Sequence, residues 1–279
     1  MRIIEAREIA DTVARLCISA NRVLPDDVRE KILEFREKEP WPAARDVLDR
    51  IVENYQLAEA KQTPVCQDTG MACVFVDIGQ EVHIEGDLNE AIDEGVRRGY
   101  REGFLRKSMA TDPLERKNSG DNAPAMRYFD FIPGDKISVT VAPKGFGSEN
   151  MSRIKMLRPS DGVEGVEDFV LSTVKEAGPN PCPPILVGVG IGGNFDKAAL
   201  IAKKALLRPL NRHNGNSFYA DLEVSLLNKI NALGIGPQGL GGRTTALGVA
   251  IETLPTHIAG LPCAVNISCH ADRRVQEIL

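Results

Sequence analysis

Three cysteines occupy positions in the sequence where ligands commonly gather. Cys66 lies in a polar loop that ends in glycine, Cys182 lies between prolines just before an apolar run, and Cys269 follows another apolar run. Loop ends on a fixed scaffold carry a large share of the binding and catalytic side chains of proteins. We therefore predict that these three thiols are ligands of a metal centre.

The other three cysteines have apolar surroundings. Cys17 lies on the apolar stripe of a predicted helix, and Cys73 and Cys263 lie inside apolar runs, where cysteine behaves as a small hydrophobic residue. The even count of six would also allow three disulfides, but the charged amino-terminal segment does not match a secretory signal. We expect a cytoplasmic protein whose thiols stay reduced, and no apolar stretch reaches the roughly 20 residues that span a membrane.

The spacing of the thiols restricts the kind of centre. The closest pairs, Cys66 with Cys73 and Cys263 with Cys269, are too far apart for the paired ligands of a zinc finger. Three thiolates are one short of the set that normally completes an iron–sulfur cluster. One iron would then be open to bind a substrate oxygen as a Lewis acid, which favours loss or gain of water over electron transfer.

Two glycine-rich segments could approach an anion. Residues 188–193 match the GxGxxG pattern of dinucleotide-binding folds, but the acidic residue expected about 20 positions later is missing from 208–213. The pattern recurs at 234–239. We interpret both segments as close backbone approaches to an anion or a cluster, with a tight packing turn as the alternative for the second. A nucleotide-binding dehydrogenase stays as a distant alternative. A P-loop is excluded, because neither glycine-rich segment is followed by the lysine and serine or threonine that such a loop requires.

Polar side chains near the first cysteine are candidates for substrate contact. Asp68 could orient a substrate hydroxyl or transfer a proton, or it could simply form an Asx turn. Arg106 lies at the end of a predicted helix and could bind a carboxylate through its guanidinium, or it could be a solvated cation. The segments 143–150 and 241–245 offer backbone amides and hydroxyls.

These residues need a scaffold of helices and strands. Residues 1–62 show helical periodicity, and the apolar runs 71–78 and 81–85 predict a β-hairpin. Further helices are predicted at 88–107, 163–177, 194–207 and 218–233, and strands at 126–132, 137–142, 185–191, 246–254 and 264–267. We expect a mixed α/β (α+β) fold, with a helical amino-terminal part and a mixed β-sheet body with flanking helices at 63–279, in a single domain over 1–279.

Composition excludes other classes. The hydrophobic fraction of 43% and the charged fraction of 26% are those of a globular protein, not of a disordered one. The net charge of −5 argues against nucleic acid as a partner, because phosphate binding needs an excess of lysine and arginine.

Taken together, these motifs resemble the alpha subunit of class I, iron–sulfur-dependent hydro-lyases, the fumarate hydratase and L(+)-tartrate dehydratase family. The resemblance covers nearly the whole chain and lies in Val65–Gly70, Asn118–Ala125, Gly188–Asn194, Gly236–Gly242 and Asn266–Cys269. It implies a [4Fe–4S] cluster that is held by Cys66, Cys182 and Cys269 and has one iron open to a dicarboxylate.

The resemblance also implies substrate contacts. Gln67, Asp68 and Arg106 would contact the substrate, with Asp68 as the catalytic candidate. The Lys144–Gly147 loop would line the site, and its Lys144 and Gly145 would also contact the substrate. The implied reaction is reversible hydration of fumarate to (S)-malate, which we favour as the commoner central-metabolic substrate. Dehydration of L(+)-tartrate to oxaloacetate is the alternative.

A partner subunit is implied as well. The family's active site needs a beta portion that carries further substrate-binding cations and a proposed hydroxyl base, and this chain ends at Leu279, soon after Cys269. It therefore resembles the two-subunit form, and we expect a heterotetramer of two alpha and two beta subunits. An electron-transfer iron–sulfur subunit and a purely structural subunit are the remaining alternatives.

Overall fold

The computed structural model describes residues 2–279 and divides the chain into two compact units. The first unit contains Met1–Pro25, Tyr55–Phe146 and Arg273–Leu279, and the second contains Asp26–Asn54 and Gly147–Asp272. Each unit contains residues from before and after position 62, where the helical amino-terminal part was expected to end. The expected single domain stays a prediction. The expected mixed α/β fold class is confirmed.

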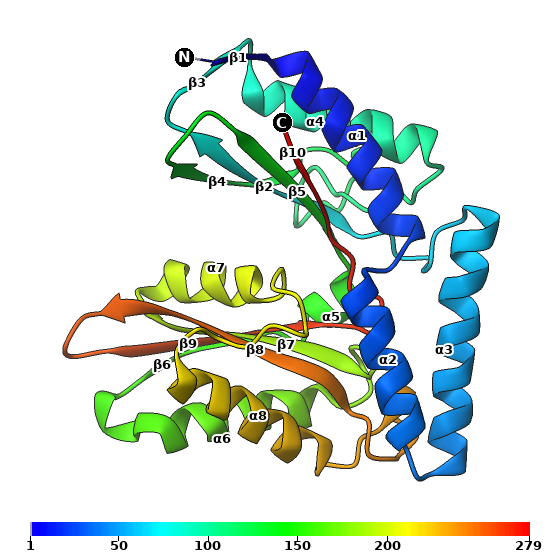
Figure 1. Cartoon of the computed structure of the whole chain (residues 1–279), viewed down its shortest axis with the longest axis vertical. Coiled ribbons are helices and arrows are strands. Elements are labelled where there is room, and N and C mark those ends of the chain that lie inside the picture. Colours follow the sequence, from blue (N-terminus) through cyan, green and yellow to red (C-terminus); the bar gives the residue numbers. More distant parts are fainter. Residues whose placement is uncertain (1) are drawn as a thin grey trace. The chain divides into compact units, whose positions relative to one another are not determined.

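The first unit is built on a four-stranded mixed sheet (Figure 1). Its strand order is β10 (Val275–Ile278), β5 (Ile137–Lys144), β2 (Met71–Gly79) and β4 (Met126–Ile132). β2 runs antiparallel to β5 and parallel to β4. A separate pair joins β1 (Arg2–Glu5) to β3 (Val82–Glu85), and the helices are α1 (Ala6–Arg22) and α4 (Leu88–Glu102).

The hairpin predicted from residues 71–85 is wrong, because β2 and β3 belong to different sheets. The chain does not fold back after β2, since the amides of Gly79 and Glu81 donate to the carbonyls of Lys136 and Gly134. These bonds fasten the end of β2 to the turn between β4 and β5. β3 is thereby left to pair in parallel with β1.

Helices α1 and α4 pack closely through small residues. A Cβ on Gly95 would lie 2.7 Å from the carbonyl oxygen of Ala10, and one on Gly99 would lie 2.7 Å from that of Ala14. The absence of a side chain at these two glycines therefore lets the helix backbones touch. The core of the unit gathers beneath them from α1, α4 and the sheet: Ile9, Val13, Leu16, Ile92, Val96, Val74, Val76, Val139 and Val141.

The second unit has a four-stranded sheet covered on both faces. Its order is β6 (Arg153–Leu157), β9 (Leu261–Ser268), β7 (Ile185–Gly193) and β8 (Ala246–Thr256). Helices α6 (Gly162–Ala177) and α8 (Ser217–Asn231) lie on one face and α7 (Phe195–Ala205) on the other (Figure 1). The remaining α-helices are α2 (Asp26–Lys38), α3 (Pro42–Lys61) and the short α5 (Phe146–Glu149), with 3-10 turns at Pro159–Asp161 and Pro237–Gly239.

The first glycine-rich segment is part of a strand and serves helix packing. Gly188 and Gly190 lie within β7, where a Cβ on either would come within 2.2 Å of a carbonyl oxygen of α7, from Ala202 and Ala198 respectively. The interpretation of these two glycines as an anion-binding approach is therefore wrong. Their role is to let α7 lie directly on the sheet.

Within residues 2–279, no helix combines the length and the apolar character needed to cross a membrane.

Candidate functional site

The six thiols fall into the two predicted groups. None of these six described cysteines forms a disulfide. Cys66 and Cys269 are half-buried and Cys182 is exposed, whereas Cys17, Cys73 and Cys263 are buried. Burial raises the pKa of Cys17 and of Cys263 to about 12. Because the thiolate is the form that binds metals, these two positions disfavour ligation. The accessible group is thus the one whose donor chemistry fits a metal centre.

In the first unit, the loop that carries Cys66 is fixed by its backbone. The Tyr100 hydroxyl lies 2.8 Å from the Thr69 carbonyl oxygen and 3.0 Å from that of Gly70. Gly70 has a φ of +77°, and a Cβ there would lie 2.9 Å from the backbone of Lys144. The loop backbone is therefore held from two sides, while the side chains of Cys66, Gln67 and Asp68 keep some exposure.

Asp68 lies at the centre of this loop's contacts. Its Oδ1 accepts a bond from the Gly70 amide at 3.0 Å, which is the Asx turn that the sequence left open. Its Oδ2 accepts from the Phe146 amide at 3.0 Å, and a Cβ on Gly145 would lie 3.4 Å from that same oxygen. The structure thus brings Asp68 together with Gly145, two of the predicted substrate residues.

The other predicted contacts in this unit are Gln67, Arg106 and Lys144. Thr69 Oγ1 accepts from the Arg106 amide at 2.9 Å and lies 3.3 Å from its carbonyl oxygen, so Arg106 is anchored beside the loop with its side chain exposed. Gln67 is exposed next to Cys66. Lys144 is buried, and its ammonium donates to the Gly145 carbonyl at 3.1 Å.

Asn122 is a supporting residue that sequence reasoning missed. It is fully buried, its Oδ1 accepts from the Ser108 amide at 2.6 Å, and its Nδ2 donates to the Gly70 carbonyl at 3.2 Å. The side chain therefore joins the segment after Arg106 to the Cys66 loop. An asparagine within the Asn118–Ala125 motif was the available signal.

In the second unit, Cys182 and Cys269 lie at one edge of the sheet. β7 and β9 are antiparallel, with Leu186 opposite Ser268, so the residues before β7 and those after β9 emerge together. The Nδ1 of His270 lies 3.0 Å from the Cys182 carbonyl oxygen. The same nitrogen lies 3.3 Å from Gln238 Nε2. His270 therefore lies beside the Cys182 loop.

The second glycine-rich segment braces the Cys182 loop. Gln238 donates to the Pro183 carbonyl from both its amide and its Nε2, each at 2.8 Å. A Cβ on Gly239 would lie 2.3 Å from Pro179 Cβ. Tight packing, the alternative left open for this segment, therefore accounts for it.

The amides near residue 243 are occupied by a carboxylate. Glu39 is buried and accepts from the amides of Arg243 at 2.9 Å and Thr244 at 2.8 Å, and from the Thr244 hydroxyl at 2.7 Å. Burial alone would raise the pKa of Glu39, but these bonds and one from the Trp41 amide lower it below its usual value. The suggestion that segment 241–245 offers amides to a substrate is wrong at these two positions.

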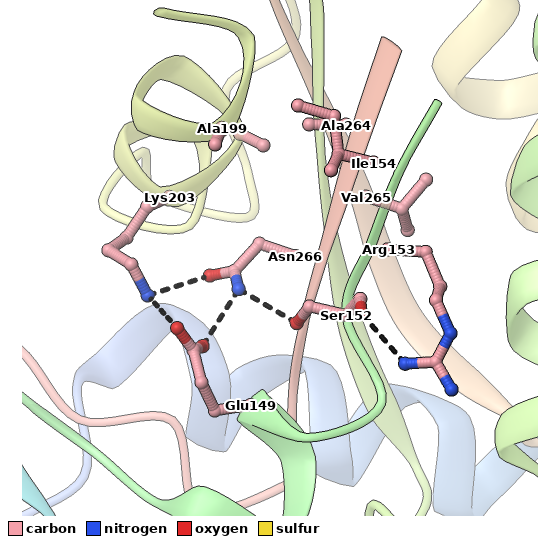
Figure 2. A pocket seen from close by; sticks show the side chains of 10 residues that line it. Glu149, Ser152, Arg153, Ile154, Ala199, Lys203, Ala264, Val265 and Asn266 are labelled. Carbon is pink, nitrogen blue, oxygen red and sulfur yellow. Dashed lines mark hydrogen bonds and ion pairs between the residues drawn. The ribbon is translucent and has the colours of Figure 1, made fainter. Parts of the chain in front are cut away.

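A polar network lies near the end of β9 and borders a cavity of about 190 Å³ (Figure 2). Lys203 Nζ lies 2.6 Å from Glu149 Oε1, and Asn266 Nδ2 donates to Glu149 Oε2 and to Ser152 Oγ, each at 2.8 Å. Ser152 Oγ also accepts from the Ile267 amide at 3.1 Å. The network therefore fixes the strand just ahead of Cys269, and sequence reasoning did not identify it.

The predicted ligand set spans both units, with Cys66 in the first and Cys182 and Cys269 in the second. Across residues 2–279, no group of three or more histidine, cysteine, aspartate or glutamate side chains is arranged as a metal site. The joint ligand role of the three thiols is therefore a proposal.

Comparison with known proteins places the chain among hydro-lyases. The family model described as "Fumarate hydratase (Fumerase)" matches residues 10–277. A Methanocaldococcus jannaschii protein provisionally named L(+)-tartrate dehydratase subunit alpha is 45% identical, over 96% of each chain. The L(+)-tartrate dehydratase alpha subunits of Escherichia coli K12 and Shigella sonnei are each 34% identical, over 96% of this chain and 89% of their own.

Proposed function

Because the chain belongs to the fumarate hydratase (Fumerase) family, we propose that it is the alpha subunit of an iron–sulfur hydro-lyase that works with a separate beta subunit. The names of its relatives support the subunit assignment, since each is called a subunit alpha. The observation that carries the proposal is the placement of Cys182 and Cys269 at one sheet edge by the register of β7 and β9.

The proposed cofactor is a [4Fe–4S] cluster held by Cys66, Cys182 and Cys269. The donor chemistry supports it, since these three thiols are accessible and the other three are buried. When bound, a cluster with three protein thiolates supplies an open iron that acts as a Lewis acid on a substrate oxygen.

The residues of the first unit suit the binding of a dicarboxylate. The exposed guanidinium of Arg106 can grip one carboxylate with two parallel hydrogen bonds. Gly145 leaves space beside Asp68 Oδ2, so a substrate hydroxyl can reach that carboxylate. Asp68 is itself held by the amides of Gly70 and Phe146, which fixes the direction of its lone pairs.

We propose L(+)-tartrate as the substrate, with loss of water to give oxaloacetate. The relatives are named L(+)-tartrate dehydratases, which supports this alternative better than the fumarate hydration that the sequence favoured. The family's own description keeps fumarate as the second candidate. The base that takes the proton from the carbon adjacent to the one that loses its hydroxyl is expected on the beta subunit.

The test is an anaerobic assay of the reconstituted chain together with its beta subunit on L(+)-tartrate, fumarate and (S)-malate. The proposal predicts a brown iron–sulfur chromophore and turnover of tartrate that exceeds that of fumarate. Turnover of fumarate alone would overturn the substrate assignment. Equal activity of the isolated chain and the complex would overturn the need for a partner.

A further inference from the structure

Within residues 2–279, Arg273 is a buried cation without a carboxylate in ion-pair distance. It lies in the first unit, just before β10, and only 3% of its surface is exposed. Its Nη1 donates to Asn21 Oδ1 and its Nη2 to the Asp68 carbonyl oxygen, both at 2.9 Å. Its Nε is buried and unpaired, and no carboxylate oxygen within residues 2–279 lies in ion-pair distance of the guanidinium.

Such an arrangement is costly for stability alone. Removing a guanidinium from water is unfavourable, and hydrogen bonds to neutral oxygens compensate only part of the lost hydration free energy. An anion that the described residues do not supply in ion-pair distance would stabilise such a charge.

The guanidinium lies just behind the proposed substrate surface. A Cβ on Gly145 would lie 3.8 Å from Arg273 Nη2 and 3.4 Å from Asp68 Oδ2, so one methyl-sized space borders both groups. The Asp68 carboxylate is directed at the amides of Gly70 and Phe146 and does not pair with Arg273. An anion seated at Gly145 would therefore lie within the field of this cation.

We propose that Arg273 is a positioning residue for the substrate dianion. Its bond to the Asp68 carbonyl fixes the Asp68–Thr69 peptide. Its charge, which has no ion-pair partner among residues 2–279, favours a dicarboxylate seated against Asp68 and Gly145. This inference rests on the proposed function, because it takes the ligand of this loop to be a dicarboxylate.

The sharpest variant neutralises the guanidinium without removing it. Asn21→Asp places a carboxylate at the position of the Oδ1 that now lies 2.9 Å from Arg273 Nη1. Asn21→Ala is the matched control, because both variants lose the bond that Asn21 Nδ2 donates to the Cys17 carbonyl. Only the aspartate adds a counter-charge, and both leave the bond from Arg273 to Asp68 in place.

The measurement is calorimetric binding of L(+)-tartrate and of its neutral diamide to the anaerobically reconstituted complex, with thermal unfolding alongside. We expect Asn21→Asp to bind the dianion at least about tenfold more weakly than Asn21→Ala, or about 1.4 kcal/mol, with the diamide unaffected. Equal dianion affinity in the two variants would overturn the proposal.

A second pair covers the case in which Asn21→Asp does not fold. Arg273→Lys keeps the charge and is expected to bind the dianion more tightly than Arg273→Gln, and equal affinity would overturn the proposal. If the wild-type complex binds neither tartrate nor fumarate, the proposed function itself fails. Binding by the wild type with no effect of any variant overturns only the role of Arg273.

Discussion

Substitution of Gly190 by alanine tests whether the glycines of β7 serve helix packing. The new Cβ would lie 2.2 Å from the Ala198 carbonyl oxygen and 2.6 Å from the Ala202 amide nitrogen, whereas ordinary contacts begin at 3.4 Å. α7 would have to move by about 1 Å, and overpacking of this kind costs about 1–3 kcal/mol. Alanine loses less backbone entropy on folding than glycine does, but this offsets only about 0.5–1 kcal/mol of that cost.

We therefore expect Gly190→Ala to destabilise the chain by about 1–2 kcal/mol, which lowers Tm by several degrees in a protein of this size. Gly215→Ala is the matched control in the same unit, because a Cβ there meets nothing within 4 Å. The assay is urea unfolding followed by circular dichroism, with nicotinamide dinucleotide binding measured in parallel. Equal stability of the two variants, or dinucleotide binding that Gly190→Ala abolishes, would refute the packing role.

Three further outcomes test the site and its supports. Gly145→Ala should leave Tm unchanged, since the new contacts of its Cβ at 3.4 and 3.8 Å are ordinary van der Waals contacts. It should nevertheless raise KM by filling the space beside Asp68. An unchanged KM would count against binding of the substrate at Asp68 and Gly145. Glu39→Gln should cost about 2 kcal/mol at neutral pH through its lost charged hydrogen bonds. Because folding lowers the pKa of Glu39, the stability that its carboxylate contributes is complete above its ordinary pKa of 4.5 and is lost as the pH falls through its lower folded-state pKa. Unfolding measured against pH should therefore show a smaller loss of stability in acid for Glu39→Gln than for the wild type. Lys203→Met and Glu149→Gln should show a coupling of about 1 kcal/mol in a double-mutant cycle of thermal unfolding, and strict additivity would contradict their ion pair.

Elements with local signals were predictable from the sequence. Apolar residues at helical spacing predicted α6 and α8, and the buried run before the glycines predicted β7. The pairing of strands was not local: β2 joins β4 and β5, which lie about 50 or more residues further along the chain, so the apparent hairpin with β3 was misleading. Alternation shows that a strand forms, but it does not identify its partner.

The glycines and the cysteines differed in how much their neighbours revealed. GxGxxG is compatible with an anion site and with a strand that bears a helix, and only the positions of Ala198 and Ala202 over β7 decide between them. The cysteines were better specified, because an apolar neighbourhood correctly indicated burial of Cys17, Cys73 and Cys263. The burial of the Arg273 guanidinium, with no carboxylate of residues 2–279 in ion-pair distance, had no sequence signal, because burial and tertiary contacts are properties of the fold.

The central claim is that three particular thiols hold an iron–sulfur cluster. The most direct measurement is the anaerobic visible spectrum of the reconstituted chain in six single Cys→Ser variants. Loss of the chromophore is expected at positions 66, 182 and 269, and retention at 17, 73 and 263. Equal loss in both groups, or no chromophore in the wild-type chain, would contradict the account.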